Sequence, residues 1–484
     1  MGGQLLTMEN SSNVNLFRTA SPVSNDERFN PNIKLNELSM KEREAAIEEL
    51  HGVSNAFKED PAIIQSSLNN IRRQLSLRGI SVFEDAELLK FLRAETFDVE
   101  KAAARFNRSA DAHRKLFGKQ GPIQYSDLSD EDKGYLQSGF MQLLPKRDRA
   151  GRAILLCIGS IKQQLKTPVE ADLRCLSFLA SKAAEDEETQ KRGIVMICYA
   201  LAQKTYDSRN NRPLHLLKAL GDFPSRVVAT HFCYDNAIMK SLVDFLGEHM
   251  ESMMLCRFRS HSGEHVECQS KLISFGIPNE CLPIDATGQV DLTNHKIFLK
   301  KTELKEQRMG AIQNGQVTFH VDEELAAATH TEGEKFLIPG HLDIILGRGQ
   351  HAKNTPGHQL FTQALEQHQK RYEAAQKSQK TNVAGLILQQ LKAGGCRFLK
   401  ARPGGGWVEV ADEVGREKIN HAFRNLRSVA KKNEPSKAIA ASSQSPIPSL
   451  PTSSSLSRKR TLNEAIDSGV YPGDGKVTKN FYSI

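Results

Sequence analysis

The stretch LLKFLRAETFDVEKA, residues 88–102, decides how the first part of this 484-residue chain folds. Its apolar residues recur at three- and four-residue spacing and the pattern continues to Phe106, as in amphipathic helices. A helical pattern of this kind extends from Met40 to Gly118. The residues before it are rich in Asn and Ser and lack periodicity. We therefore expect a disordered leader over 1–40 and a helical lobe over 41–120.

Short β-rich runs alternate with helical stretches in the region that follows. The runs predict strands at 153–158, 193–200, 227–234 and 253–258. Strands separated by helices of this length are typical of an α/β sheet, so we expect an α/β domain over 121–300.

Four motifs in a fixed order give this region a family likeness. The first is the 88–102 stretch. The others are DRAGRAI at 148–154, FPSR at 223–226 and IPNECLP at 277–283. Over about residues 75–290 the chain resembles the CRAL-TRIO lipid-binding family, the group of the yeast phosphatidylinositol transfer protein and the tocopherol and retinal carriers. The resemblance implies a helical lobe beside a mixed sheet, with an apolar ligand cavity closed by a mobile gate helix.

The gate position of this resemblance falls on residues 237–246. Without the family likeness, an ordinary amphipathic core helix explains the same spacing. The family's Asn-x-Pro reads Asn236-Ala237-Ile238 here, and its Lys-Pro-Phe-Leu reads VDFL at 243–246, so the identity of the ligand stays open. Our candidates for contact with the ligand form one apolar face at helical spacing: Ile238, Met239, Leu242, Val243, Phe245 and Leu246.

A second compact unit follows a polar segment, 301–338, that we expect to be a linker. Residues 339–432 contain helical stretches, a strand at 396–401, a glycine turn at 404–406 and a strand at 407–410, which predicts a small α+β domain with a hairpin. Over about 340–430 the pattern resembles a domain of unknown function that is common in diatom and other stramenopile proteins. The Ser- and Pro-rich end, 433–484, is expected to be a disordered tail.

The positive charge of the chain gathers in this second unit. Between 341 and 434 about sixteen Lys and Arg face about eight acids, an excess close to the +8 of the whole chain. Such a surface suits nucleic-acid phosphates or anionic lipid headgroups, with Phe398 and Trp407 available for stacking. A solvated basic face with Trp407 in the core is the other interpretation. The candidate polyanion-binding residues are Arg348, Lys370, Arg371, Arg397, Lys400, Arg402, Arg424 and Arg427.

The eight cysteines form no Cys-x-x-Cys pair, and most lie in apolar stretches. This pattern is typical of buried free thiols in a reducing compartment. Cys256, His261, His265 and Cys268 are zinc-type ligands close together in sequence, but their spacing is not that of a standard finger. We expect a buried thiol and solvated histidines there, and neither a metal nor another cofactor.

Two functions remain open at this stage. No apolar run approaches the ~20 residues that span a bilayer, no secretory signal is visible, and no hydrolase, zinc-protease or kinase motif is present, so we expect a protein without catalytic activity. The first function is binding, transfer or sensing of a hydrophobic ligand such as a phospholipid, in the cytoplasm and peripherally at anionic membranes. The second is regulation, in which the basic domain binds nucleic acid or a protein partner and the lipid domain is a sensor. Arg458-Lys459-Arg460 is a minimal nuclear signal, which leaves nuclear localisation open.

Overall fold

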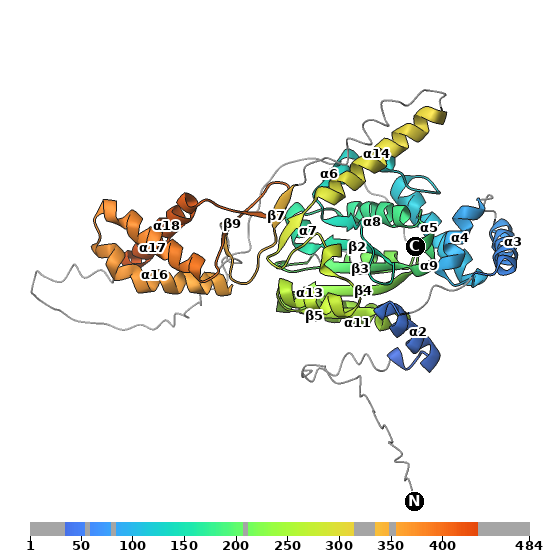
Figure 1. Cartoon of the computed structure of the whole chain (residues 1–484), viewed down its shortest axis with the longest axis horizontal. Helices are drawn as coiled ribbons and strands as arrows, with labels where there is room; N and C mark the ends of the chain where they lie inside the picture. Colours follow the sequence, from blue (N-terminus) through green and yellow to red (C-terminus); the bar gives the residue numbers. More distant parts are fainter. Residues whose placement is uncertain are drawn as a thin grey trace, which may run out of the picture. The chain divides into compact units, whose positions relative to one another are not determined.

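The computed structural model describes residues 34–53, 59–78, 84–206, 212–313, 334–347 and 355–433 (Figure 1). The chain divides into one large compact unit, Met1–Arg427, and a C-terminal unit, Ser428–Ile484. The large unit includes most of the predicted domain at 339–432. All contacts discussed below lie within the large unit. The expected leader and tail fall almost entirely outside the described residues.

The helical lobe contains α2 (Met40–His51), α3 (Pro61–Leu77), α4 (Asp85–Ala94) and α5 (Val99–Phe117). The aspartates Asp60 and Asp98 cap α3 and α5, because each side chain accepts a hydrogen bond from a first-turn backbone N–H. The apolar stripes of α3, α4 and α5 share one core that includes Leu68, Leu92 and Phe106. The helical spacing of the 88–102 stretch is thus confirmed.

The first sheet has five strands in the order β1-β2-β3-β4-β5. They are β1 (Met141–Leu143), β2 (Ala153–Ile158), β3 (Ile194–Tyr199), β4 (Val227–Tyr234) and β5 (Phe258–Ser262). Strand β1 is antiparallel to β2, and the other neighbours are parallel. The expected strands at 153–158 and 227–234 are confirmed, and the one at 193–200 is correct to within a residue at each end.

The expected strand at 253–258 is wrong. Residues Ser252–Cys256 form the short helix α12, and the strand starts at Phe258, which is paired with Thr230 of β4. A short apolar run such as Met253-Met254-Leu255 fits a helix or a strand equally well by periodicity. Tertiary pairing, which the local sequence does not encode, decides between them.

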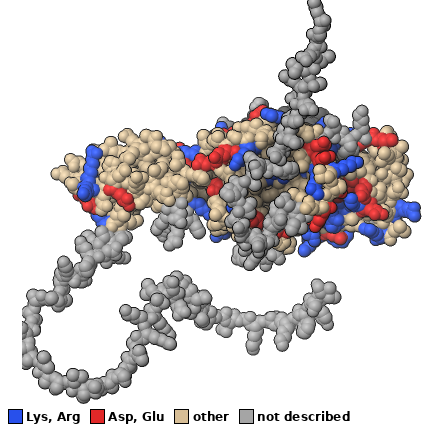
Figure 2. Space-filling view, turned by 90° about the horizontal axis from the view of Figure 1, so that it is seen from below, with Lys and Arg blue, Asp and Glu red and all other residues tan. Residues whose placement is uncertain are grey.

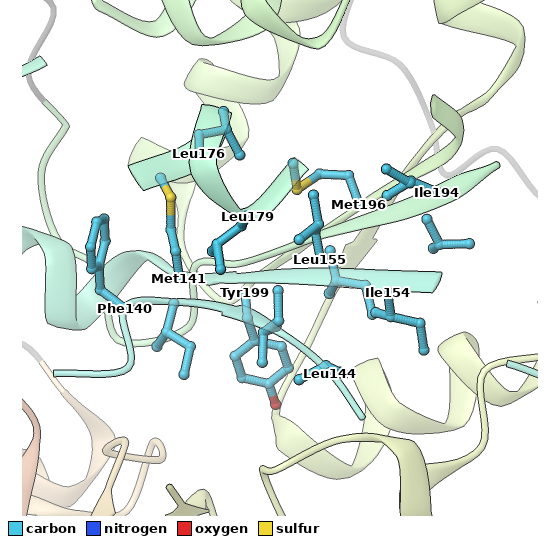
Figure 3. Packing of buried hydrophobic residues seen from close by; sticks show 14 of the residues in the cluster. Phe140, Met141, Leu144, Ile154, Leu155, Leu176, Leu179, Ile194, Met196 and Tyr199 are labelled. Atoms are coloured by element: carbon cyan, nitrogen blue, oxygen red, sulfur yellow. The ribbon is translucent and has the colours of Figure 1, made fainter. Parts of the chain in front are cut away.

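Helices cover both faces of this sheet. Side chains alternate along a strand, so Leu155, Met196, Phe232 and Phe258 lie on one face, and Tyr199 and His231 lie on the other. The first face packs against α8 (Val169–Ala183), α10 (Arg212–Leu220) and α11 (Ala237–His249). Figure 3 shows Leu176 and Leu179 of α8 on the side of Leu155 and Met196, with Tyr199 pointing to the opposite side. Helices α2 and α13 (His265–Ser274) pack on the second face.

A second five-stranded sheet joins the two predicted domains. It contains β6 (Gln289–Asp291), β7 (Lys335–Leu337), β8 (Ile344–Leu346), β9 (Phe398–Ala401) and β10 (Trp407–Glu409), in the order β6-β7-β10-β9-β8. The expected β9–β10 hairpin is confirmed by its antiparallel register, in which Val408 is paired with Lys400. Strand β7 lies between β6, from the first domain, and β10, from the second.

Residues 301–338, which we expected to be a linker, contain part of a long helix and a strand. Helix α14 (Thr293–Gln313) continues to residue 313, and 335–337 is strand β7. Only a narrow stripe of α14, with Leu299 and Leu304, is buried, so its sequence is mostly polar and shows weak periodicity. Residues 314–333 lie outside the described part of the chain.

The helices of the second domain are α16 (Pro356–Ala374), α17 (Lys377–Ala393) and α18 (Asp412–Asn433). They enclose a second core with Phe361, Ile387 and Phe398. The sequence predicts helices at about 363–379 and 383–392, but α16 starts at Pro356 and α17 at Lys377. Helix α16 starts earlier because Thr355 caps it and Pro356 occupies its first turn. The helices and the hairpin predicted for 339–432 are present, with one strand, β8, in addition to the hairpin.

Candidate ligand slot

Helix α11 lies at the expected gate position and packs on the first face of the sheet. Its N-terminus is capped by Asn236, whose Oδ1 accepts hydrogen bonds from the backbone N–H groups of Ile238 and Met239, both at 3.1 Å. Met239, Leu242 and Val243 are buried in a cluster with Phe232 and Phe258.

The six candidate residues of α11 divide into three groups. Met239, Leu242 and Val243 face the sheet, at 0, 6 and 8% exposure. Phe245 and Leu246 are half-buried at the edge of the same cluster, and Ile238 points outward with 46% exposure. Their contact with a ligand remains a prediction, and Ile238 is not positioned for it in this arrangement.

The first face of the sheet forms an apolar surface beneath α10 and α11, which we call the floor, and this surface includes two thiols. Cys157 of β2 and Cys198 of β3 are register partners on the first face, and each is the one incompletely buried residue of its strand. Burial raises the pKa of Cys198 to about 12. We call the layer between this floor and helices α10 and α11 the ligand slot. Sequence reasoning treated these cysteines only as buried thiols.

Both ends of α11 are held by polar contacts. At the N-terminal end, the side-chain amide of Asn236 donates to the carbonyl of Gln203 at 2.8 Å and to Asp235 at 2.7 Å. At the C-terminal end, the Lys34 ammonium donates to the carbonyl oxygens of Glu248 at 2.5 Å and Met250 at 2.9 Å. These contacts fix both ends of α11 over the first face of the sheet.

Residues 34–52, which we call the N-terminal strap, connect α11 to the rest of the domain. Near its start, Glu37 accepts a hydrogen bond from Ser252 of α12. Near its end, the Glu49 carboxylate forms ion pairs with Arg226, at 3.1 Å, and with Arg257. No sequence signal could have found these contacts, because the partners are about 200 residues apart.

The second face of the sheet carries buried histidines with specific partners. The Tyr199 hydroxyl lies 2.8 Å from His265 Nδ1, and His265 Nε2 lies 3.2 Å from the Ile338 carbonyl oxygen. Because that carbonyl accepts only, Nε2 carries the proton and donates, and Nδ1 accepts from the tyrosine. Burial lowers the pKa of His265, which keeps its ring neutral. This chain of hydrogen bonds runs from β3 to the residue after β7.

His231 and His261 form the other buried pair. His231 Nδ1 lies 3.0 Å from His261 Nε2, and burial lowers the pKa of both rings, that of His261 to about 4. The expectation of solvated histidines is therefore wrong for His261 and His265. Among the residues that the structure describes, no cluster of three or more potential ligands could hold a metal ion.

Two of the candidate cations of the second domain are paired with acids of this chain. Arg397 makes a bidentate ion pair with Asp343, at 2.9 and 2.7 Å, and donates to the Thr287 carbonyl at 2.9 Å. Arg402 pairs with Glu334. These two arginines therefore bind acids and carbonyl groups of this chain.

The other candidate polyanion-binding residues differ in how far they are exposed to solvent. Lys370, Arg371, Lys400 and Arg424 are exposed, Arg427 is half-buried, and Arg348 lies outside the described residues. Phe398 and Trp407 are buried, so neither ring is available for stacking as expected. Figure 2 shows Lys and Arg interspersed with Asp and Glu on the face that it presents.

Known proteins have sequences related to about half of this chain. An "Alpha-tocopherol transfer protein-like" protein of Mus musculus is 23% identical over 250 residues, which is 50% of this chain and 69% of that protein. "Clavesin-1" of Xenopus laevis is 24% identical over 242 residues, 48% of this chain and 70% of clavesin. Both belong to the CRAL-TRIO family. About half of the chain therefore has CRAL-TRIO homologues, as the motifs predicted.

Two further comparisons complete this assignment. Residues 343–425 match a family model described as "Domain of unknown function (DUF6824)", within the expected 340–430. "Tyrosine-protein phosphatase non-receptor type 9" of Homo sapiens is 29% identical over 143 residues, which is 23% of that protein and 29% of this chain. So short a match is not evidence of phosphatase activity. None of the described helices is long and apolar enough to cross a membrane.

Proposed function

We propose that this protein binds a small hydrophobic ligand, such as a phospholipid, in the ligand slot, without catalysis. The observation that carries the proposal is the packing of α11 over an apolar floor that contains Cys157 and Cys198, each the one incompletely buried residue of its strand. The names of the relatives, tocopherol transfer and clavesin, support a ligand of this class. Transfer between membranes, or sensing of the ligand, follows if α11 opens reversibly.

The energetics of the slot suit an apolar ligand. Burial of apolar surface contributes about 25 cal/mol per Å², so an acyl chain supplies much of its own affinity. Displacing α11 costs the contacts of Met239, Leu242 and Val243 with the sheet, and the ligand replaces these contacts with its own. Burying a charged headgroup in the same layer would require partners that the apolar side chains do not offer.

The second function left open by the sequence, regulation through nucleic acid, has less support. Arg397 and Arg402 are engaged within the chain, and both rings expected to stack on bases are buried. Peripheral association with membranes in the cytoplasm accords better with a lipid ligand and belongs to this proposal. The residues Arg458-Lys459-Arg460 lie outside the described part, so nuclear localisation remains a separate prediction.

The test is the lipid content of the full-length protein purified from cells, measured by mass spectrometry of an organic extract. Cys198→Trp fills the slot and should abolish co-purification of the lipid. Ser241→Trp adds the same side chain on the exposed side of α11 and serves as the matched control. A folded wild-type protein that consistently carries no lipid, and takes up none from vesicles, would contradict the proposal.

A further inference from the structure

An aromatic stack in the second domain has one face open to cations. The rings of Tyr372, on α16, and Phe423, on α18, are stacked with centroids 3.9 Å apart and an interplanar angle of 13°. The Tyr372 hydroxyl donates to Asn420 at 2.8 Å, which fixes the ring in its plane. Because Phe423 covers one face of the Tyr372 ring, only the other face is available for further contacts.

Two cations from different helices converge on this ring. Lys380 of α17 lies 5.6 Å from the ring centroid, and Arg427 of α18 lies 5.5 Å from it. Both are half-buried, and each is attracted by the negative face of the ring. Two like charges held near one ring repel each other, and an anion in contact with both would reduce this repulsion.

Two more cations extend this site. Lys377 precedes Lys380 by three positions on α17, and Arg424 precedes Arg427 by three positions on α18, so each lies on the same helix face as its neighbour. Lys377 and Arg424 are exposed. We call Lys377, Lys380, Arg424 and Arg427 the Tyr372 patch.

Most acids of the second domain interact with residues other than the four patch cations. Asp343 binds Arg397, Glu409 and Asp412 bind Lys392, and Glu413 binds Arg416. Glu417 lies 3.7 Å from His421, and Glu373, the acid next to Tyr372 in sequence, accepts a hydrogen bond from Gln369. Among the described residues, no ion pair joins an acid to any of the four patch cations.

We infer that the Tyr372 patch is a binding site for phosphate-bearing anionic lipids at a membrane surface, which gives the domain of unknown function a role in membrane docking. The partner is a lipid surface because the cations lie on successive turns of two helices, and Leu426, the residue before Arg427, is 37% exposed. An apolar residue beside a basic cluster suits the interface of a bilayer. The inference goes beyond the proposed function and does not depend on a ligand in the slot.

Nucleic acid fits this surface less well. Single strands bind by stacking bases on aromatic rings, and the rings of Tyr372, Phe423 and Trp407 are all buried. Duplex DNA is contacted along a track of phosphates, whereas two of the four cations lie over one ring and the other two lie one helical turn away from them. Binding of DNA is therefore the outcome that would reassign the site.

The experiment uses the full chain and co-sedimentation with vesicles of phosphatidylcholine, with and without phosphatidylserine. Lys377→Gln combined with Arg424→Gln removes two exposed charges without touching the ring, and Lys380→Gln combined with Arg427→Gln removes the other two. Each Lys or Arg near an anionic surface contributes about 1 kcal/mol, or about 5-fold in affinity, so each double variant should bind about 25-fold more weakly. Circular dichroism and thermal unfolding should match the wild type.

The matched control is Arg416→Gln combined with Lys418→Gln, two cations of α18 that lie outside the patch. Retained binding in the control, with loss in both patch variants, supports the inference. Equal losses in all three would show a diffuse charge effect and overturn it, as would absence of binding by the wild type. Tighter binding to duplex DNA than to the vesicles at equal salt, lost in the patch variants, would assign the site to nucleic acid instead. Lipid in the slot is measured separately by extraction, so the two proposals fail independently.

Discussion

The ammonium of Lys34 lies 2.9 Å from the carbonyl oxygen of Met250, the residue that ends α11. The carbonyl groups in the last turn of a helix have no partner within the helix, and a cation is favourable there. The same lysine also binds the Glu248 carbonyl. The N-terminal strap thus holds the helix that closes the ligand slot.

The first prediction is that Lys34→Ala combined with Glu37→Gln loosens α11 and α12. Hydrogen bonds of charged groups contribute about 1.5–3 kcal/mol each, so amide hydrogen exchange in 237–256 should accelerate by at least about tenfold. Uptake of a fluorescent lipid should accelerate as well. Lys41→Ala, an exposed lysine on α2, is the control. Unchanged exchange in the double variant would show that the strap does not restrain α11.

The second prediction concerns the Glu49 carboxylate, which lies between Arg226 and Arg257. Glu49→Gln leaves two largely buried guanidinium groups without their acid, and removal of one partner from such a pair costs about 3–5 kcal/mol. The first domain should therefore unfold at a lower temperature or denaturant concentration. Glu48→Gln, one position earlier and exposed, should have little effect. Equal behaviour of the two variants would contradict this role for Glu49.

The third prediction is a loss of stability in acid that arises from His231 and His261. Burial lowers the pKa of His261 from 6.5 to about 4, so the unfolded chain binds a proton that the folded chain does not. Stability is therefore retained above pH 6.5 and falls as the pH drops toward 4, by up to about 3 kcal/mol from this group. His261→Gln does not titrate and should show a smaller loss between pH 7 and pH 4.5 in denaturant titrations. The same loss in wild type and variant would exclude His261 as the cause.

The fourth prediction concerns the ion pair of Arg397 and Asp343. Asp343 is 3% exposed and also accepts a hydrogen bond from the Gly340 backbone N–H, so Asp343→Asn weakens both the pair and the turn before β8. We expect a loss of about 2–4 kcal/mol in the second domain and faster limited proteolysis near 338–343. Glu413→Gln, which removes an exposed pair with Arg416, is the control. Resistance to protease equal to wild type would show that the pair is dispensable.

Local patterns predicted the elements of this protein better than they predicted its contacts. The apolar runs of β2 and β4 and the hairpin turn at 404–406 depend on neighbouring residues, and sequence identified them. Strand β6 has three residues and α14 has a narrow buried stripe, so their local signals are weak. The six apolar residues of α11 were found from a family motif, although Ile238 faces outward. The partners of Arg397, Arg402 and Lys34 come from distant parts of the chain, which no local pattern encodes.

The position of β7 restricts how the two domains of this protein can be separated by recombination. Since β7 pairs with β6 on one side and β10 on the other, the boundary between the domains runs through the interior of a sheet. A cut in the gene near residue 338 separates β7 from β10. The N-terminal product then has an unpaired edge on β7, and the C-terminal product has an unpaired edge on β10. Recombination that transfers the second domain to another protein would therefore have to carry β7, residues 335–337, with it, and the new host would have to supply an equivalent of β6.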